Sequence, residues 1–157
     1  MRSFKAILIL LTLLCALSTV KARMVLQFPT PRGTIVDFLK DPPCASYNST
    51  NVSAITTFPL NGEAIMLFSS GEGNLVYYYA PNSNGTFTKV AEPVTLIKND
   101  TYPRSVTKRV DLTLAGAKAG DQGVLQGVYV SLKNDTAWYQ CGDIKIADAL
   151  QSSVVPY

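Results

Sequence analysis

Apolar and polar residues alternate along several short stretches of this chain, the pattern typical of β-strands with one buried face. The clearest stretch is residues 105–114, which read SVTKRVDLTL. Four of its apolar residues share one parity and are predicted to face a core: Val106, Val110, Leu112 and Leu114. Residues 123–132 repeat the pattern, and three of their valines are predicted to face inward: Val124, Val128 and Val130.

Further strands are predicted wherever runs of β-branched and aromatic residues lie between turn-forming residues. They cover residues 63–69, 74–80, 86–90, 94–97 and 136–146. The dipeptides Asn61-Gly62 and Asn84-Gly85 are typical of tight turns, and only a weak helical tail is expected near residues 147–151. About seven to nine short strands without repeats or linkers predict one all-β domain, an antiparallel β-sandwich.

Three consecutive tyrosines, Tyr77 to Tyr79, could form an aromatic platform for sugars or pack in the core. Successive residues of a strand face opposite sides of the sheet, so at most two of the three share a face. We favour core packing, with Tyr78 facing inward.

Residues 1–22 have the pattern of a secretory signal peptide. Arg2 and Lys5 precede an apolar run over residues 6–17, and small residues precede a cleavage point after Ala22. The alternative is a membrane anchor, but a spanning helix needs about 20 apolar residues. We therefore expect a mature domain over residues 23–157 that is secreted or at the cell surface, with no transmembrane segment. The last residues of this chain, ADALQSSVVPY, lack the hydrophobic tail typical of a GPI-anchor signal, so we expect no such signal within it.

Charge and composition exclude several classes of function. The predicted signal peptide holds three of the 14 basic residues and none of the 11 acidic ones, so the mature chain has 11 of each. A nucleic-acid partner is therefore not expected, because phosphate neutralisation needs a basic excess. The chain also contains no histidine, which excludes Ser-His-Asp and Cys-His catalysis and most imidazole-based copper or zinc sites.

Two features agree with export. Cys44 and Cys141 remain in the mature chain, an even number typical of a disulfide in an oxidising compartment, although two buried thiols are the alternative. Closing a loop this long should stabilise the fold by about 4–5 kcal/mol. Five asparagines open N-glycosylation triplets: Asn48, Asn51, Asn84, Asn99 and Asn134.

Several sequence blocks together resemble one known family. They read RMVLQFPTPRG from Arg23, then DPPC, TTFPLNG, SSG, GDQGVLQGVYV and WYQCGDI. In order and spacing they are similar to the fungal copper acquisition factors, relatives of the lytic polysaccharide monooxygenases that have lost oxidase chemistry. The resemblance covers nearly all of the mature chain. It implies an immunoglobulin-like β-sandwich and a disulfide between Cys44 and Cys141.

The family's copper ligands are not reproduced here. Its members begin the mature chain with a histidine, which forms a brace around Cu(II) with a second, mid-chain histidine and an aspartate. The matching positions in this chain hold Arg23, Gly71 and Asp143. One carboxylate and an α-amine make a poor Cu(II) site, and a guanidinium opposes a dication, so we expect no metal and no cofactor. Arg23 is either exposed at the chain terminus or paired with Asp143 in place of the metal.

Three functions follow from these observations. We favour a non-catalytic, glycosylated surface or extracellular binding protein, a monomer whose partner, outside the cell or in the cell wall, is unknown. The first alternative keeps copper handling at a non-histidine site, such as the thioethers of Met24 and Met66. The second is a polysaccharide-acting enzyme that uses two carboxylates, with Glu63, Glu72 and Glu92 as candidates by residue type alone.

Overall fold

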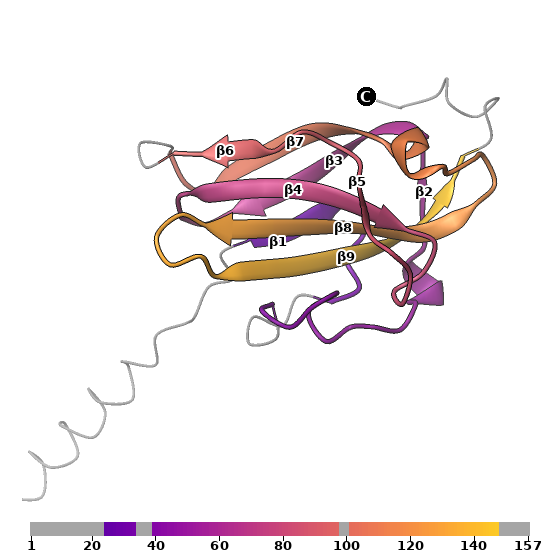
Figure 1. Ribbon diagram of the computed structural model, residues 1–157, viewed down its shortest axis with the longest axis horizontal. Coiled ribbons are helices and arrows are strands. Elements are labelled where there is room, and N and C mark those ends of the chain that lie inside the picture. Colours follow the sequence, from indigo (N-terminus) through magenta and orange to yellow (C-terminus); the bar gives the residue numbers. More distant parts are fainter. Residues whose placement is uncertain (1–23, 34–38, 98–100, 148–157) are drawn as a thin grey trace, which may run out of the picture.

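Two β-sheets packed face to face form the structure, a computed structural model that describes residues 24–33, 39–97 and 101–147 (Figure 1). The three-stranded sheet has the order β1-β3-β7, with β1 at Met24–Phe28, β3 at Asn61–Phe68 and β7 at Arg104–Asp111. The six-stranded sheet has the order β2-β9-β8-β4-β5, and β6 also pairs with β4. Its strands are β2 (Thr56–Phe58), β4 (Gly73–Ala80), β5 (Thr88–Lys89), β6 (Val94–Leu96), β8 (Gln122–Ser131) and β9 (Ala137–Ile146). The predicted all-β sandwich is confirmed.

The strands pair mainly with antiparallel neighbours. In the six-stranded sheet, β4 pairs with β8 and β8 with β9 along most of their lengths. The exception is β2, which runs parallel to β9 at the sheet edge. Within the described residues, two short 3₁₀ helices lie in the connections: η2 (Val52–Ala54) and η3 (Leu112–Ala115). In Figure 1, strands β4, β8 and β9 lie in front of β1 and β3, which form the second layer of the sandwich.

The core lies between the sheets and is formed by alternate residues of each strand. Met66 and Phe68 of β3 face Tyr77 of β4 and Tyr129 of β8, and all four are fully buried. Gly127 of β8 provides space for this packing, because a Cβ there would lie 2.4 Å from the Met66 methyl carbon. Alternation of this kind is what the sequence predicts for strands with one buried face.

The prediction of which β8 residues face the core is wrong. Leu125 and Tyr129 face the core, whereas Val128 and Val130 are half-buried on the opposite face. Val124 is buried, but on that opposite face, where it packs against the two cysteines. The prediction fails because Gly123 and Gly127 occupy core positions of this strand. The core face of β8 therefore reads as less apolar than its outer face.

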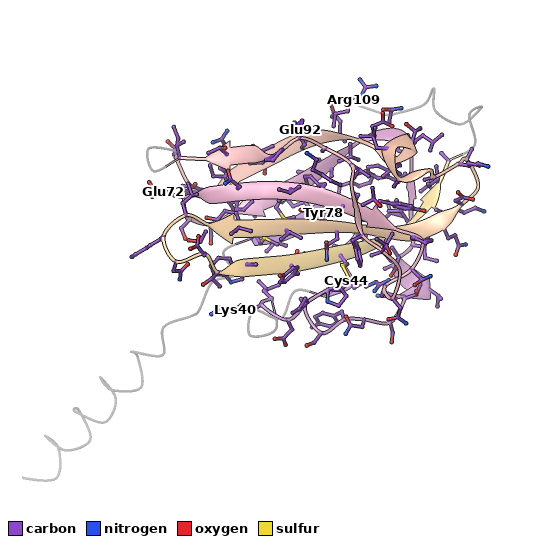
Figure 2. The ribbon with its side chains drawn as sticks, in the orientation of Figure 1. Lys40, Cys44, Glu72, Tyr78, Glu92 and Arg109 are labelled. Carbon is purple, nitrogen blue, oxygen red and sulfur yellow. A yellow bond between two sulfur atoms is a disulfide. The ribbon has the colours of Figure 1, made fainter. Side chains whose placement is uncertain are left out.

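Three other local predictions are also corrected. Tyr78, labelled in Figure 2, is half-buried on the outer face, and Tyr77 and Tyr79 face the core instead. Leu114 is 63% exposed because β7 ends at Asp111, whose carboxylate accepts a hydrogen bond from the Thr113 amide and caps η3. The Asn61-Gly62 dipeptide begins β3 and does not form a hairpin turn.

The strand bounds agree with prediction for most of the chain. Strands β3, β4, β6 and β9 lie within a few residues of their predicted ranges, and β5 is shorter than expected. Strands β1 and β2 were not predicted. The weak helical tail expected at residues 147–151 lies almost wholly outside the described residues, as does the predicted signal peptide. Within the described ranges, no helix has the length and apolar character to cross a membrane.

Replacing Tyr77 with Phe should not weaken the fold. Among the described residues its buried hydroxyl has no hydrogen-bond partner, and burial raises the pKa of this hydroxyl. Removing it should raise the free energy of unfolding by up to about 1 kcal/mol, because an unmet polar group is expensive to bury. Chemical denaturation measures this value.

Tyr79→Phe is the matched control. The Tyr79 hydroxyl donates to the Gln122 carbonyl over 3.3 Å, so its removal should lower the free energy of unfolding by about 1 kcal/mol. A larger loss for Tyr77→Phe than for Tyr79→Phe would contradict the description of the core.

Candidate functional site

A disulfide holds the segment that precedes η2 against the outer face of β9. Cys44 and Cys141 are bonded, with their Cα atoms 5.2 Å apart, which confirms the predicted pairing. Gln126 of β8 adds a side-chain hydrogen bond to the Pro43 carbonyl over 2.6 Å. Figure 2 shows this bridge at the lower edge of the sheet, beside the label of Cys44. Residues 39–51 are thereby fixed close to the residues of β9 that follow Cys141.

Asp143 lies two residues beyond the disulfide, on the same face of β9, and its carboxylate is held by an arginine. Arg32 donates from Nε to Oδ2 over 2.8 Å and from Nη2 to Oδ1 over 2.5 Å. Asp143 is 3% exposed and Arg32 7% exposed. The pair is therefore a bidentate ion pair removed from water, the geometry in which a guanidinium binds a carboxylate most strongly.

Arg32 reaches Asp143 because the chain runs alongside β9 after β1 ends. Pro31 forms an isolated β-bridge with Gly142, and the Arg32 amide donates to the Cys141 carbonyl over 2.8 Å. The sequence block that contains Arg32, FPTPRG, thus packs directly beside the block that contains Asp143, CGDI. These two blocks were separate parts of the family resemblance and form one site in the fold.

The remaining polar atoms of the ion pair are also bonded. Arg32 Nη1 donates to the Tyr47 carbonyl over 3.0 Å and to the Ser83 hydroxyl over 2.5 Å. The Asn51 amide donates to Asp143 Oδ2 over 2.8 Å. The site therefore joins β9 to the disulfide-bonded segment and to the β4–β5 loop. A buried ion pair is tolerated when its lone pairs and protons are satisfied in this way.

Two hollows flank the ion pair. One has a volume of about 60 Å³ and is lined by Thr50, Ile55, Pro81, Asn82, Gln122, Gly123, Val124, Asp143 and Ile144. The other, more open, has a volume of about 410 Å³ and is lined by Arg32 and residues 46–51. Two predicted glycosylation positions, Asn48 and Asn51, belong to the larger hollow. A third, Asn84, adjoins Ser83 and is exposed.

Gly71, the position matched to the second histidine, lies far from Asp143. Gly71 precedes β4, whose first residue, Gly73, pairs with Ser131. Asp143 pairs with Val124, which pairs with Ala80 at the other end of β4. Seven residues of strand separate Gly73 from Ala80, about 23 Å. The structure therefore does not bring Gly71 and Asp143 into one metal site.

The ion pair expected at Asp143 exists, but with another arginine. Arg23, which the resemblance suggested as the partner, lies outside the described residues. Arg32 forms the ion pair with the Asp143 carboxylate instead. The sequence analysis missed Arg32 because the resemblance pointed to Arg23, and no local pattern shows which arginine reaches Asp143, 111 positions beyond Arg32. The proline before it and the glycine after it were the available signal, since they mark a turn at which one arginine side chain is fixed.

The candidate carboxylates do not converge, whereas the two candidate methionines lie on the same face of the paired strands β1 and β3. Met24 and Met66 are fully buried on the inner face of the three-stranded sheet. Glu92 pairs with Lys89 at the surface over 3.0 Å, and Figure 2 shows Glu72 well apart from it at one end of the sandwich. Glu63 is exposed on β3. Among the described residues, no group of three or more histidine, cysteine, aspartate or glutamate side chains could hold a metal ion.

Comparisons with known proteins agree with this fold. A model of the family described as copper acquisition factor, BIM1-like, matches residues 21–155. No curated protein matches the chain.

The solved structures show likeness of fold. LPMO10B from Micromonospora aurantiaca superposes with a TM-score of 0.51 at 10% identity, over 64% of this chain and 58% of that one, somewhat over half its length. The polysaccharide monooxygenase CBM33 superposes with a TM-score of 0.50 at 12% identity, over 78% of both chains.

Removing the charge of Asp143 should damage the fold severely. Asp143→Asn leaves the Arg32 guanidinium buried without a counter-charge, and the expected loss is about 3–5 kcal/mol of unfolding free energy. Chemical denaturation at neutral pH measures the loss. The double variant Arg32→Met/Asp143→Asn should lose less than the sum of the two single variants, because the two sites interact.

Glu92→Gln provides the control. The Lys89–Glu92 pair has side chains 48% and 79% exposed, and its loss should cost less than about 1 kcal/mol. Equal effects of Asp143→Asn and Glu92→Gln would refute the structural role of the buried pair.

Proposed function

Because the chain belongs to the BIM1-like copper acquisition factor family, we propose that it is a secreted, glycosylated protein that binds a partner outside the cell or in the cell wall, without catalysis and without a histidine-brace copper site. One observation carries the proposal: the chain contains no histidine. The family relation supplies the extracellular or cell-surface location and the sandwich. The absence of histidine is the reason for proposing that copper binding has been lost.

The donor atoms of this chain do not fit Cu(II). Two imidazoles and an amine in a near-planar array suit this ion, and no imidazole is available. Asp143 is the carboxylate that the resemblance matches to a ligand, and both of its oxygens accept hydrogen bonds from Arg32. A carboxylate neutralised by a buried guanidinium is a poor donor to a dication.

Copper handling through sulfur has little support. Met24 and Met66 have no exposed surface, since Met24 pairs with Phe68 and Met66 with Leu26 inside the sandwich. Thioethers that bind Cu(I) must be reached by the ion. Both methionines instead contribute to the hydrophobic core.

Enzymatic activity also has little support. The neighbours of similar fold include a polysaccharide monooxygenase. That chemistry depends on a copper site, for which this chain lacks the imidazoles. A glycosidase needs two carboxylates about 5–10 Å apart across a sugar. Glu72 and Glu92 lie well apart (Figure 2), and Glu92 is engaged with Lys89.

Glycosylation at the surface is consistent with the positions of the triplets. Asn48, Asn84 and Asn134 are exposed, and Asn51 is half-buried at the rim of the larger hollow. Asn99 lies outside the described residues. Three of the triplets lie near the Arg32–Asp143 pair, so sugars there would gather around this site.

The secreted protein should bind no copper tightly. After mixing with one equivalent of Cu(II) and desalting, elemental analysis should find far less than one copper per chain. A family member whose mature chain begins with histidine serves as the positive control and should retain the metal. Retention of one copper by this protein would refute the proposed loss of metal binding.

Intact-mass analysis and N-terminal sequencing test secretion and glycosylation. The secreted product should begin at Arg23, and its mass should fall after enzymatic removal of N-linked sugars, which converts each occupied asparagine to aspartate. Asn84→Gln should remove one sugar chain, whereas Asn82→Gln, a neighbour outside any triplet, should remove none. A retained leader or an unchanged mass would contradict the proposal.

A further inference from the structure

We infer that the end of the sandwich at Gly71 is closed to a metal by two tyrosines, so that restoring the histidines alone would not restore a copper site. The inference deepens the proposed function and rests on it for the match of Gly71 to the second histidine. It concerns the shape of this end of the fold, which the absence of histidine from the sequence does not determine.

The backbone at Gly71 is the first obstacle. Its φ is +125°, a value that residues with a side chain rarely adopt. A Cβ built on this backbone would lie 2.5 Å from the Tyr129 hydroxyl oxygen. An imidazole at this position therefore needs both a strained backbone and the displacement of Tyr129.

Tyr129 is not free to move aside. It is fully buried, and its ring lies 5.2 Å from the ring of Phe68 and 5.5 Å from that of Trp138. On the Gly73 side, a Cβ would lie 2.4 Å from Cε2 of the same ring, so even a methyl group has no room there. Interiors packed this closely resist added volume, because the neighbouring side chains have no room to shift.

A second tyrosine fixes the loop itself. Tyr102, which precedes β7, donates its hydroxyl proton to the Gly71 carbonyl. This bond ties the β3–β4 connection to the chain entering β7. Tyr102 therefore holds the backbone at Gly71 by a hydrogen bond, while the Tyr129 hydroxyl occupies the space that a side chain at Gly71 would need.

The stability of alanine variants tests the closure without any metal. Gly71→Ala places a side chain on a backbone with positive φ and brings its Cβ too close to the Tyr129 hydroxyl. Gly116→Ala is the matched control, because Gly116 has a φ of +75° and no atom within 4 Å of a built Cβ. We expect Gly71→Ala to lower the unfolding equilibrium constant about tenfold more than Gly116→Ala does. Adding Tyr129→Phe should reduce that difference. Equal effects of the two alanines would overturn the inference.

Copper binding by histidine variants tests the consequence. The double variant Arg23→His/Gly71→His, purified with its N-terminus at residue 23, should retain far less than one Cu(II) after desalting. Electron paramagnetic resonance should show no copper bound by nitrogen ligands. Stoichiometric retention with a nitrogen-ligand spectrum would overturn the inference.

The two hypotheses fail differently. Copper retained by the unmodified protein refutes the proposed function, and copper retained by the double variant alone refutes the closure at Gly71. If the double variant does not fold, the comparison of Gly71→Ala with Gly116→Ala still decides between a closed and an open end.

Discussion

The buried ion pair between Arg32 and Asp143 is the interaction on which the arrangement of this molecule depends. Two full charges leave water, and their removal is compensated by the two-pronged contact and by hydrogen bonds to Tyr47, Ser83 and Asn51. Each partner belongs to a different part of the chain. The ion pair therefore fixes the positions of the disulfide-bonded segment and the β4–β5 loop relative to β9. Apolar packing is non-directional and could not fix them in this way.

The opposite end of the sandwich is organised by aromatic packing. The rings of Phe68, Tyr129 and Trp138 pack one against the next in tilted contacts, and Lys40 lies 6.0 Å from the centre of the Trp138 ring. This end therefore has an apolar interior and a cation at its surface. The two ends are therefore stabilised by different forces.

The sequence predicts the fold well and the site only in part. Alternation of apolar residues identified most long strands, and the two cysteines of the mature chain are bonded to each other. The pattern did not predict which face of β8 is buried, because glycines that accommodate Met66 and Tyr79 occupy its core positions. Strand β2 is only three residues long and lies at the sheet edge, so no periodicity marks it.

The site was hard to predict for a different reason. Asp143 was identified by the family resemblance, which matches it to a ligand aspartate in the block CGDI. Its partner depends on how β1 and the following turn run along β9, which is a property of the whole topology. Local patterns can suggest that a buried carboxylate needs a cation, but several arginines satisfy that requirement equally until the strands are placed.

The long-range contacts also determine the order in which parts of the domain can fold. Three separate contacts join an early segment to the last strand: Arg32 to Asp143, Cys44 to Cys141, and β2 to β9. An emerging chain makes local hairpins first and must wait for distant partners. The first third of the domain therefore stays incomplete, with the thiol of Cys44 unpaired, until the residues of β9 have been synthesised.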